Sequence, residues 1–486
     1  MESSSSKPHA VLLSSPGMGH LIPVLELGKR LVILHNFDVT VFVVASQTSA
    51  AESSIIESAM RPKLCQVIEL PRPDISGLIG PDAEVFTILA VMMREIKPAL
   101  RSAISSLKSP PTMLVVDLFG TESLIIADEL QIQKYVYITI NAWCLALAVY
   151  APTLDKLVQG EYIDKNGSFN IPGCVPVRPS DVVDPMLDRT NPQYLEYVRM
   201  GLKIPMNSGI LINTWEDLEP TTLAALRHVK HLGRILKASV YTVGPIARPL
   251  GPVGSNKELF DWLDKQPQES VLYISLGSGG TLSLEQTIEL AWGLELSQQR
   301  FVWVVRRPTE KTGDGSYFKV GNDDDELSRF LPEGFLTRTH NKGVVVSQWA
   351  AQVEILSHPS VGGFLSHCGW NSTVESITNG VPIIAWPLYA EQKMNATLLK
   401  EELGIAVRSM NLPSAATVGR EEIKMMVRRM MVEEEGRGLR ARVKELKLSG
   451  ERAWKNGGSS YNGLSMLAKE CQVIGHYQCP VSEARL

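Results

Sequence analysis

Short apolar runs typical of buried strands alternate, along this 486-residue chain, with segments whose apolar residues recur at helical spacing. Ala10–Leu13 is a short apolar run, residues 21–31 have helical spacing, and Val39–Val44 is rich in β-branched residues. Met113–Val116 is a further strand-like run that ends at Asp117. This alternation predicts β-α-β units, and therefore a parallel sheet covered by helices.

The alternation is interrupted and then restarts, which predicts two domains. Between Tyr162 and Tyr194 the chain is polar and rich in Pro and Asp, so we expect surface loops there. Residues 246–257, IARPLGPVGSNK, have the composition of an interdomain linker. Strand-like runs then return at Val271–Leu276, Phe301–Val305, Val344–Val346, Gly363–Leu365 and Ile383–Trp386. We expect two doubly wound α/β domains, an N-terminal one at 1–245 and a C-terminal one at 258–460.

Composition excludes several classes of protein. Hydrophobic residues make up 44% of the chain and charged residues 21%, which is normal for a soluble globular enzyme. A net charge of -4 offers no basic field for nucleic acid or anionic lipid. No apolar run approaches the roughly 18 residues needed to span a bilayer. Six cysteines without a Cys-x-x-Cys pair argue against structural zinc or disulfides, so we expect a cytoplasmic protein.

Two polar residues follow strand ends in the first half of the chain. His20 lies just past the first strand and Asp117 ends a later one. Ligands of open parallel sheets bind outside the carboxyl ends of the strands, so the two residues can face one crevice. An imidazole held by a carboxylate is a good general base, although each residue could instead cap a helix. Gly17-x-Gly19 is a weak dinucleotide signal, because Ile22 occupies the third glycine position.

A second group of polar side chains occupies strand ends in the second half. An exposed Trp349 could stack on a nucleobase, or it could be a core residue. Near the start of a short helix, His367, Asn371 and Ser372 suit a pyrophosphate, because free N–H groups and the helix dipole favour anions there. Glu375 either accepts hydrogen bonds from ribose hydroxyls or closes a capping box with Ser372.

Two further strand ends carry groups of this kind. Ser278 follows the first strand of the second domain and could donate to a phosphate. Glu391 and Gln392 offer acceptors and donors to neighbouring sugar hydroxyls, or else they cap the next helix. All of these groups recur at the same edge of one predicted sheet. Together they suit a ligand that is part base, part sugar and part pyrophosphate.

With these residues the chain resembles the plant glycosyltransferases that use uridine-diphosphate (UDP) sugars. Residues 349–392 have the length of that family's C-terminal signature box and carry HCGWNS at 367–372. The resemblance runs nearly end to end, from SPGMGHLIP to the final Glu391-Gln392, and is greatest to the branch acting on monolignols, hydroquinones and flavonoids. Two departures are Ala351, where the family usually has Pro, and Leu276, where it usually has Phe.

The resemblance implies a GT-B fold, in which two Rossmann-like domains face each other across a cleft and residues 461–486 pack back on the N-terminal domain. It implies His20 as the base, Asp117 as its partner, and an acceptor site that includes His20, Phe119, Asn141 and Ala390. The implied UDP-sugar site comprises Ser278, Trp349, Ala350, Gln352, His367, Trp370, Asn371, Ser372, Glu375, Glu391 and Gln392. A terminal Gln is similar to the glucose-using members.

The expected function is therefore an inverting transfer of glucose from UDP-glucose to a hydroxyl of a small phenolic acceptor, giving a β-O-glucoside. We expect no metal, no permanently bound cofactor, no nucleic-acid partner and a monomer. Two alternatives are an NAD-dependent oxidoreductase and a non-catalytic UDP-sugar-binding protein. Against the first, no acidic residue ends the second strand at Val44-Ala45-Ser46. Against the second, a protein that only binds needs neither His20 nor Asp117.

Overall fold

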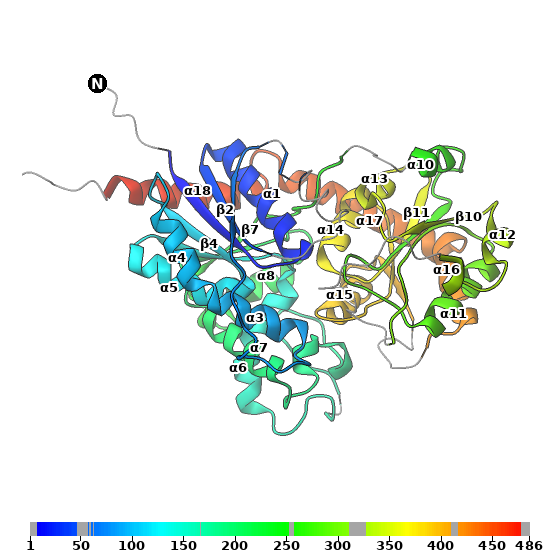
Figure 1. Cartoon of the computed structure of the whole chain (residues 1–486), viewed down its shortest axis with the longest axis horizontal. Helices are drawn as coiled ribbons and strands as arrows, with labels where there is room; N and C mark the ends of the chain where they lie inside the picture. The colour runs from blue at the N-terminus through cyan, green and yellow to red at the C-terminus, as the bar shows by residue number, and fades with distance from the viewer. Residues whose placement is uncertain are drawn as a thin grey trace, which may run out of the picture.

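The computed structural model describes residues 7–45, 57, 60–61, 63–165, 167–251, 257–310, 327–409 and 417–477. These residues form two α/β lobes, each built on a parallel sheet with helices on its faces (Figure 1). Residues 252–256 of the predicted linker lie outside the described residues. In the described part of the chain, no helix is long and apolar enough to cross a bilayer.

The N-terminal sheet has seven strands in the order β3-β2-β1-β4-β5-β6-β7, all parallel. In that order the strands are β3 (Gln66–Leu70), β2 (Asp38–Val44), β1 (His9–Ser14), β4 (Met113–Asp117), β5 (Gln133–Ile138), β6 (Gly209–Ile212) and β7 (Ser239–Thr242). Its helices are α1 (Met18–His35), α3 (Val85–Glu95), α4 (Lys97–Ser105), α5 (Leu124–Leu130), α6 (Ala142–Leu157), α7 (Pro192–Lys203), α8 (Pro220–Arg227) and α9 (Gly233–Leu236). The strand order reverses between β1 and β4.

The C-terminal sheet has six parallel strands in the order β10-β9-β8-β11-β12-β13. They are β10 (Gly343–Ser347), β9 (Arg300–Val305), β8 (Val271–Ser275), β11 (Val361–Ser366), β12 (Ile383–Ala385) and β13 (Ala406–Arg408). Around it lie α10 (Lys257–Leu263), α11 (Leu284–Ser297), α12 (Phe335–Thr339), α13 (Gln352–Leu356), α14 (Trp370–Asn379), α15 (Gln392–Thr397), α16 (Arg420–Met431) and α17 (Glu434–Ala453). Here the order reverses between β8 and β11, so each sheet is doubly wound, as expected.

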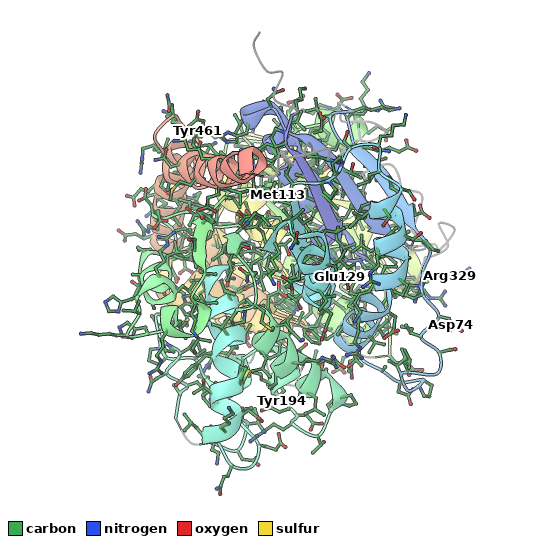
Figure 2. The ribbon with its side chains drawn as sticks, turned by 90° about the vertical axis from the view of Figure 1, so that its left-hand side faces the viewer. Asp74, Met113, Glu129, Tyr194, Arg329 and Tyr461 are labelled. Atoms are coloured by element: carbon green, nitrogen blue, oxygen red, sulfur yellow. The ribbon has the colours of Figure 1, made fainter. Side chains whose placement is uncertain are left out.

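The last helix, α18 (Ser459–Tyr477), leaves the C-terminal lobe and packs on the N-terminal one. Glu470 accepts hydrogen bonds from Tyr135 and Tyr241, and the Cys471 thiol contacts the Met113 sulfur at 3.4 Å. Figure 2 shows this helix lying across the sheet, with Tyr461 at one end and Met113 of β4 beneath it. The return begins before residue 461, because the Trp215 indole already donates to the Ser449 hydroxyl of α17.

The expectation of surface loops between Tyr162 and Tyr194 is wrong for residues 181–186, which are largely buried. Tyr162, Val177 and Asp181 are fully buried, and two short 3₁₀ turns, η2 (Pro179–Asp181) and η3 (Asp184–Met186), lie against the C-terminal lobe. A polar, proline-rich composition is typical of loops, but it does not reveal whether a loop faces water or another domain. Residues 179–186 pack between the two lobes.

Candidate active site

A cavity of about 1040 Å³ lies between the lobes, at the carboxyl ends of both sheets. Each sheet presents its topological switch point there, the place where ligands of doubly wound folds bind. On the N-terminal side the loops after β1 and β4 line the cavity, and on the C-terminal side the loops after β8 and β11 do so. Every predicted donor-site residue from Ser278 to Gln392 lines this one cavity.

The structure brings His20 and Asp117 together. His20 Nδ1 lies 3.1 Å from Asp117 Oδ2, although the ring is turned away from ideal hydrogen-bond geometry. Gly17 precedes α1 with a φ of 103°, a backbone conformation that favours glycine, and His20 is the third residue of the helix rather than its cap. Asp117 is fully buried and also accepts hydrogen bonds from Ser15 N, Ser15 Oγ and Gly120 N. These bonds hold the carboxylate facing His20.

The wall beside His20 is aromatic and apolar. The rings of His20 and Phe119 meet edge to face with centroids 5.4 Å apart. Phe86 packs on Phe119 at 4.9 Å, and Tyr197 packs on Phe86 at 5.8 Å. Phe86 and Tyr197 were not predicted as site residues, because they lie on α3 and α7, whose patterns resemble ordinary amphipathic helices. This wall suits a flat, largely apolar ligand.

Asn141, predicted to bind the acceptor, is not part of the cavity wall. It is fully buried, its side-chain oxygen accepts from Cys144 N at the start of α6, and its amide donates to Asn395 Oδ1 at 2.6 Å. Direct contact with an acceptor is therefore not supported. Asn141 caps a helix and joins the two lobes.

Gln352, Ser372 and Glu375 form one hydrogen-bonded cluster in the donor half. The Gln352 amide donates to Ser372 Oγ at 2.9 Å and to Glu375 Oε2 at 2.7 Å. Burial raises the pKa of Glu375 to about 6, and the bond from Gln352 opposes that rise. The capping-box interpretation is wrong, because α14 begins after Gly369 and makes no side-chain cap. Glu375 instead lines the cavity while its carboxylate accepts from Gln352.

His367 is held between two glycines. A Cβ atom at Gly277 or at Gly369 would lie within 2.5 Å of its ring, so neither position accepts a larger residue without movement. Burial lowers the pKa of His367 to about 4, and the nearby charge of Arg306 adds to this effect. His367 Nδ1 is buried without a hydrogen-bond partner among the described residues. The imidazole is therefore neutral near pH 7 and can serve as a hydrogen-bond donor, not as a positive charge.

Sequence analysis also missed Arg306, which follows β9 and lines the cavity. Its guanidinium donates to the backbone oxygens of Ser278 and Gln348. The position of Arg306 in the sequence could have indicated this role, because a charged residue directly after a buried parallel strand lies at the ligand edge of a doubly wound sheet. Ser278 itself is exposed in the turn after β8, in position to address an anion beside Arg306.

Two residues of the HCGWNS motif reach across to the other lobe. The Trp370 indole nitrogen donates to Asn213 O at 2.8 Å, and Asn371 Nδ2 donates to Gly19 O at 3.1 Å. Trp370 is buried, so its ring packs between the lobes while its edge lines the cavity. Ala350 is also buried along this wall, whereas Trp349 is partly exposed and available for stacking.

The last predicted donor residues, Glu391 and Gln392, lie at the start of α15. Gln392 Oε1 accepts from the backbone N–H groups of Leu388 and Tyr389 at 2.9 and 3.1 Å. The Glu391 carboxylate accepts from Asn395 Nδ2 at 3.3 Å, and burial raises its pKa. Helix capping by this pair is wrong, because α15 has no side-chain cap from Glu391. The amide nitrogen of Gln392 makes no hydrogen bond within the described residues.

Two doubly wound domains that share one cleft, with His20 beside the buried Asp117 carboxylate, are arranged as in the GT-B glycosyltransferases. Residues 223–418 match the family model "UDP-glucoronosyl and UDP-glucosyl transferase". The chain is 65% identical to "Anthocyanidin 3-O-glucosyltransferase 5" of Manihot esculenta over 96% of each protein. It belongs to the plant UDP-glycosyltransferases, in their O-glucosyltransferase branch, and is an enzyme that uses a UDP-sugar and a small-molecule acceptor.

Solved structures agree with this assignment. TcCGT1 in complex with UDP is 50% identical, with a TM-score of 0.89 over 96% of this chain and 100% of that one. UGT2 of Phytolacca americana, complexed with UDP-2fluoro-glucose and pterostilbene, is 37% identical, with a TM-score of 0.84 over 96% of this chain and 100% of that one. The predicted GT-B fold is confirmed, and the oxidoreductase alternative is not supported.

Proposed function

We propose that the enzyme transfers glucose from UDP-glucose to a hydroxyl of a small phenolic acceptor, with inversion at the anomeric carbon. The observation that carries this proposal is the His20–Asp117 pair beside an aromatic wall, opposite the donor half of the same cavity. The names of the relatives support it, since an anthocyanidin and pterostilbene are both phenolic. Phe119 and Ala390 line the cavity and are proposed acceptor contacts.

In the proposed reaction His20 takes the proton of the acceptor hydroxyl. Nδ1 faces Asp117, which leaves Nε2 for the acceptor. The oxygen then attacks the anomeric carbon from the face opposite the diphosphate, the bond from that carbon to the diphosphate oxygen breaks, and UDP departs. The product is a β-glucoside, and Asp117 stabilises the imidazolium formed on the way.

The departing diphosphate gains negative charge that must be stabilised. We propose that the N-terminus of α14 and the hydroxyl of Ser278 donate to it, with neutral His367 as a further donor. Trp349 stacks on uracil, Ala350 and Gln352 lie near the base and ribose, Asn371 and Ser372 address phosphates, Glu375 holds the ribose, and Trp370, Glu391 and Gln392 address the sugar. Arg306 adds positive charge at the same edge.

A panel of phenols incubated with UDP-glucose tests the proposal. Mass spectrometry identifies the glucosides, and the proton coupling of the anomeric centre by nuclear magnetic resonance gives their configuration. We expect β-glucosides of several phenols. An α-linked product would refute inversion. Turnover of other acceptors with no phenol accepted would refute the acceptor class.

Uridine binding is expected to weaken in acid through Glu375. The carboxyl has a pKa of about 6 in the free enzyme, and ribose hydroxyls donating to it would lower that pKa in the complex. Affinity is therefore full above pH 6 and falls as the pH drops through that value. We expect the Kd of uridine, which carries no titrating phosphate, to rise by up to about tenfold between about pH 7 and about pH 5.

Isothermal titration calorimetry across this pH range measures the change. The control is Glu375→Gln, which keeps a similar shape without a titrating group and should bind uridine more weakly but with a flat pH profile. If the variant and the unchanged protein show the same pH dependence, another group is responsible.

Donor choice is expected to depend on Gln392. Its carbonyl oxygen is held by Leu388 N and Tyr389 N, so only its amide nitrogen remains to address a sugar hydroxyl. Gln392→His should lower the glucose-to-galactose product ratio, because a polar group left unpaired by the wrong epimer costs about 1–2 kcal/mol, or roughly 5- to 30-fold. The assay is competition between UDP-glucose and UDP-galactose at equal concentration.

Inhibition by UDP, which has no sugar, is the control for this variant. An unchanged inhibition constant shows that the nucleotide site is intact. An unchanged product ratio would place sugar discrimination elsewhere in the cavity.

A further inference from the structure

The interdomain segment Pro179–Met186 is anchored on the C-terminal lobe at two aspartates. The first is Asp181, whose buried carboxylate receives Arg408 Nη2 at 2.6 Å and Thr397 Oγ1 at 3.1 Å. These partners lie on β13 and at the end of α15. Because the ion pair is buried and multiply hydrogen-bonded, it fixes where the segment sits on the C-terminal lobe.

The second aspartate, Asp184, makes two hydrogen bonds to Ala390, in the loop at residues 386–391 that precedes α15 and is called the donor loop below. Asp184 N donates to Ala390 O at 3.0 Å, and Asp184 Oδ2 accepts from Ala390 N at 2.6 Å. Asp184 Oδ1 accepts from Lys393 Nζ at 2.8 Å, in the first turn of α15. Two bonds from one residue of the N-terminal lobe therefore hold the loop that leads into Gln392, and a third holds the first turn of α15.

Ala390 needs such support, because its backbone is in a region that alanine rarely adopts. Its φ is 57°, in the left-handed region, where a Cβ atom is disfavoured by about 1 kcal/mol or more. This conformation turns the chain immediately before Glu391 and Gln392. At the start of α15, the side-chain oxygen Oε1 of Gln392 accepts hydrogen bonds from Leu388 N and Tyr389 N of the loop. The turn is thus held from the inside by Gln392 and from the other lobe by Asp184.

We infer that Asp184 is a positioning residue for the donor sugar. The inference rests on the proposed function in one respect, that Glu391 and Gln392 address the sugar. Asp184 keeps Ala390 in its left-handed conformation and so sets where those two side chains lie. Its neighbours Val183, Pro185 and Leu187 line the same cavity from the N-terminal side. Asp184 lines this cavity as well, and the N-terminal lobe thereby contributes to donor choice through the loop that it holds.

The test compares Asp184→Ala with variants that divide its contacts. Asp184→Ala removes the acceptor for Ala390 N and for Lys393. Lys393→Met and Asp184→Asn each remove the charge pair but leave an oxygen beside Ala390 N. The matched control is Glu402→Ala, which deletes another interdomain hydrogen bond, from Trp143 Nε1 at 3.1 Å, away from the donor loop.

Asp184→Ala should lower kcat with UDP-glucose by about tenfold, because a sugar misplaced by a fraction of an ångström loses alignment with the acceptor. It should lower the glucose-to-galactose product ratio about fivefold, and the inhibition constant of UDP should change little, since UDP has no sugar. Asp184→Asn and Lys393→Met should change the product ratio less, and Glu402→Ala should leave it unchanged. Melting temperatures report whether each variant is folded.

An unchanged product ratio in folded Asp184→Ala overturns the inference, as do equal changes in Asp184→Ala and Glu402→Ala, which would mean general loosening of the interface. Should Asp184→Ala fail to fold, Asp184→Asn and Lys393→Met decide, and no shift in ratio in either of them overturns it. Gln392→His separates the two proposals. An unchanged product ratio in Gln392→His refutes the assignment of Gln392 to the sugar. A changed ratio in Gln392→His with unchanged ratios in the Asp184 variants refutes only the positioning role of Asp184.

Discussion

His20→Ala is expected to lower glucosylation of weakly acidic phenols by about 10²- to 10⁴-fold, the range that general-base catalysis contributes. Nδ1 of the imidazole lies 3.1 Å from Oδ2 of the buried Asp117, and His20 also lines the cavity. The donor site lies on the opposite lobe, so UDP binding should be nearly unchanged. The loss should be smaller for acceptors that are already ionised, because they have no proton to give up.

The measurement is kcat/KM for matched phenols with pKa values of about 7 and about 10, since their ionised fractions differ strongly near neutral pH. His35→Ala, which removes an imidazole from the far end of the same helix, controls for damage to α1. UDP affinity by calorimetry controls for the donor site. Equal losses for the two phenols would argue against general-base catalysis.

Asp117→Asn is expected to cost about 10²-fold in kcat/KM, the lower end of the range that a general base contributes. The amide cannot stabilise an imidazolium and no longer selects the tautomer with a proton on Nδ1. Asp117 Oδ2 already accepts from Ser15 N, and Oδ1 accepts from Ser15 Oγ and Gly120 N. Whichever carboxylate oxygen the asparagine amide nitrogen replaces, it faces one of these N–H groups, and two donors cannot bond to each other. A small loss of stability is therefore expected as well.

Activity as a function of pH, together with the melting temperature, separates the two effects. Ser15→Ala is the matched control, because it removes one hydrogen bond to the same carboxylate and keeps its charge. It should cost much less activity than Asp117→Asn. A folded Asp117→Asn enzyme with full activity at every pH would rule out the pairing.

The cleft is bridged directly by residues of the signature motif. Trp370 and Asn371 donate to backbone oxygens of the other lobe, at Asn213 and Gly19. Asn371 therefore uses its amide for the opposite lobe in this state, and contact with a phosphate requires it to share or exchange that bond. The two lobes are therefore hydrogen-bonded to each other through side chains that also line the cavity.

The strands and their order of appearance were predictable from local pattern. Strands β1, β4, β8 and β11 are short buried apolar runs, and the residues after them lie at the ligand edge because parallel strands all point the same way. Hence His20 and Asp117 could be placed at the ligand edge of one sheet, and Ser278 and His367 at that of the other. That the two edges face one cleft was implied only by the family resemblance. Ala351 and Leu276, the two departures from the family pattern, are both buried and remove no polar group from the cavity wall.

Local patterns in the chain were sufficient to predict the doubly wound class of each half and the polar groups at the strand ends, since both depend on residues close together in the sequence. The tertiary structure alone decided which partners those groups meet. Glu375 binds Gln352 rather than closing a cap, Asn141 joins the lobes rather than lining the cavity, and Asp184 reaches Ala390. The reason is physical: these contacts join segments far apart in sequence, and hydrogen-bonding capacity does not specify a partner until packing brings one within reach.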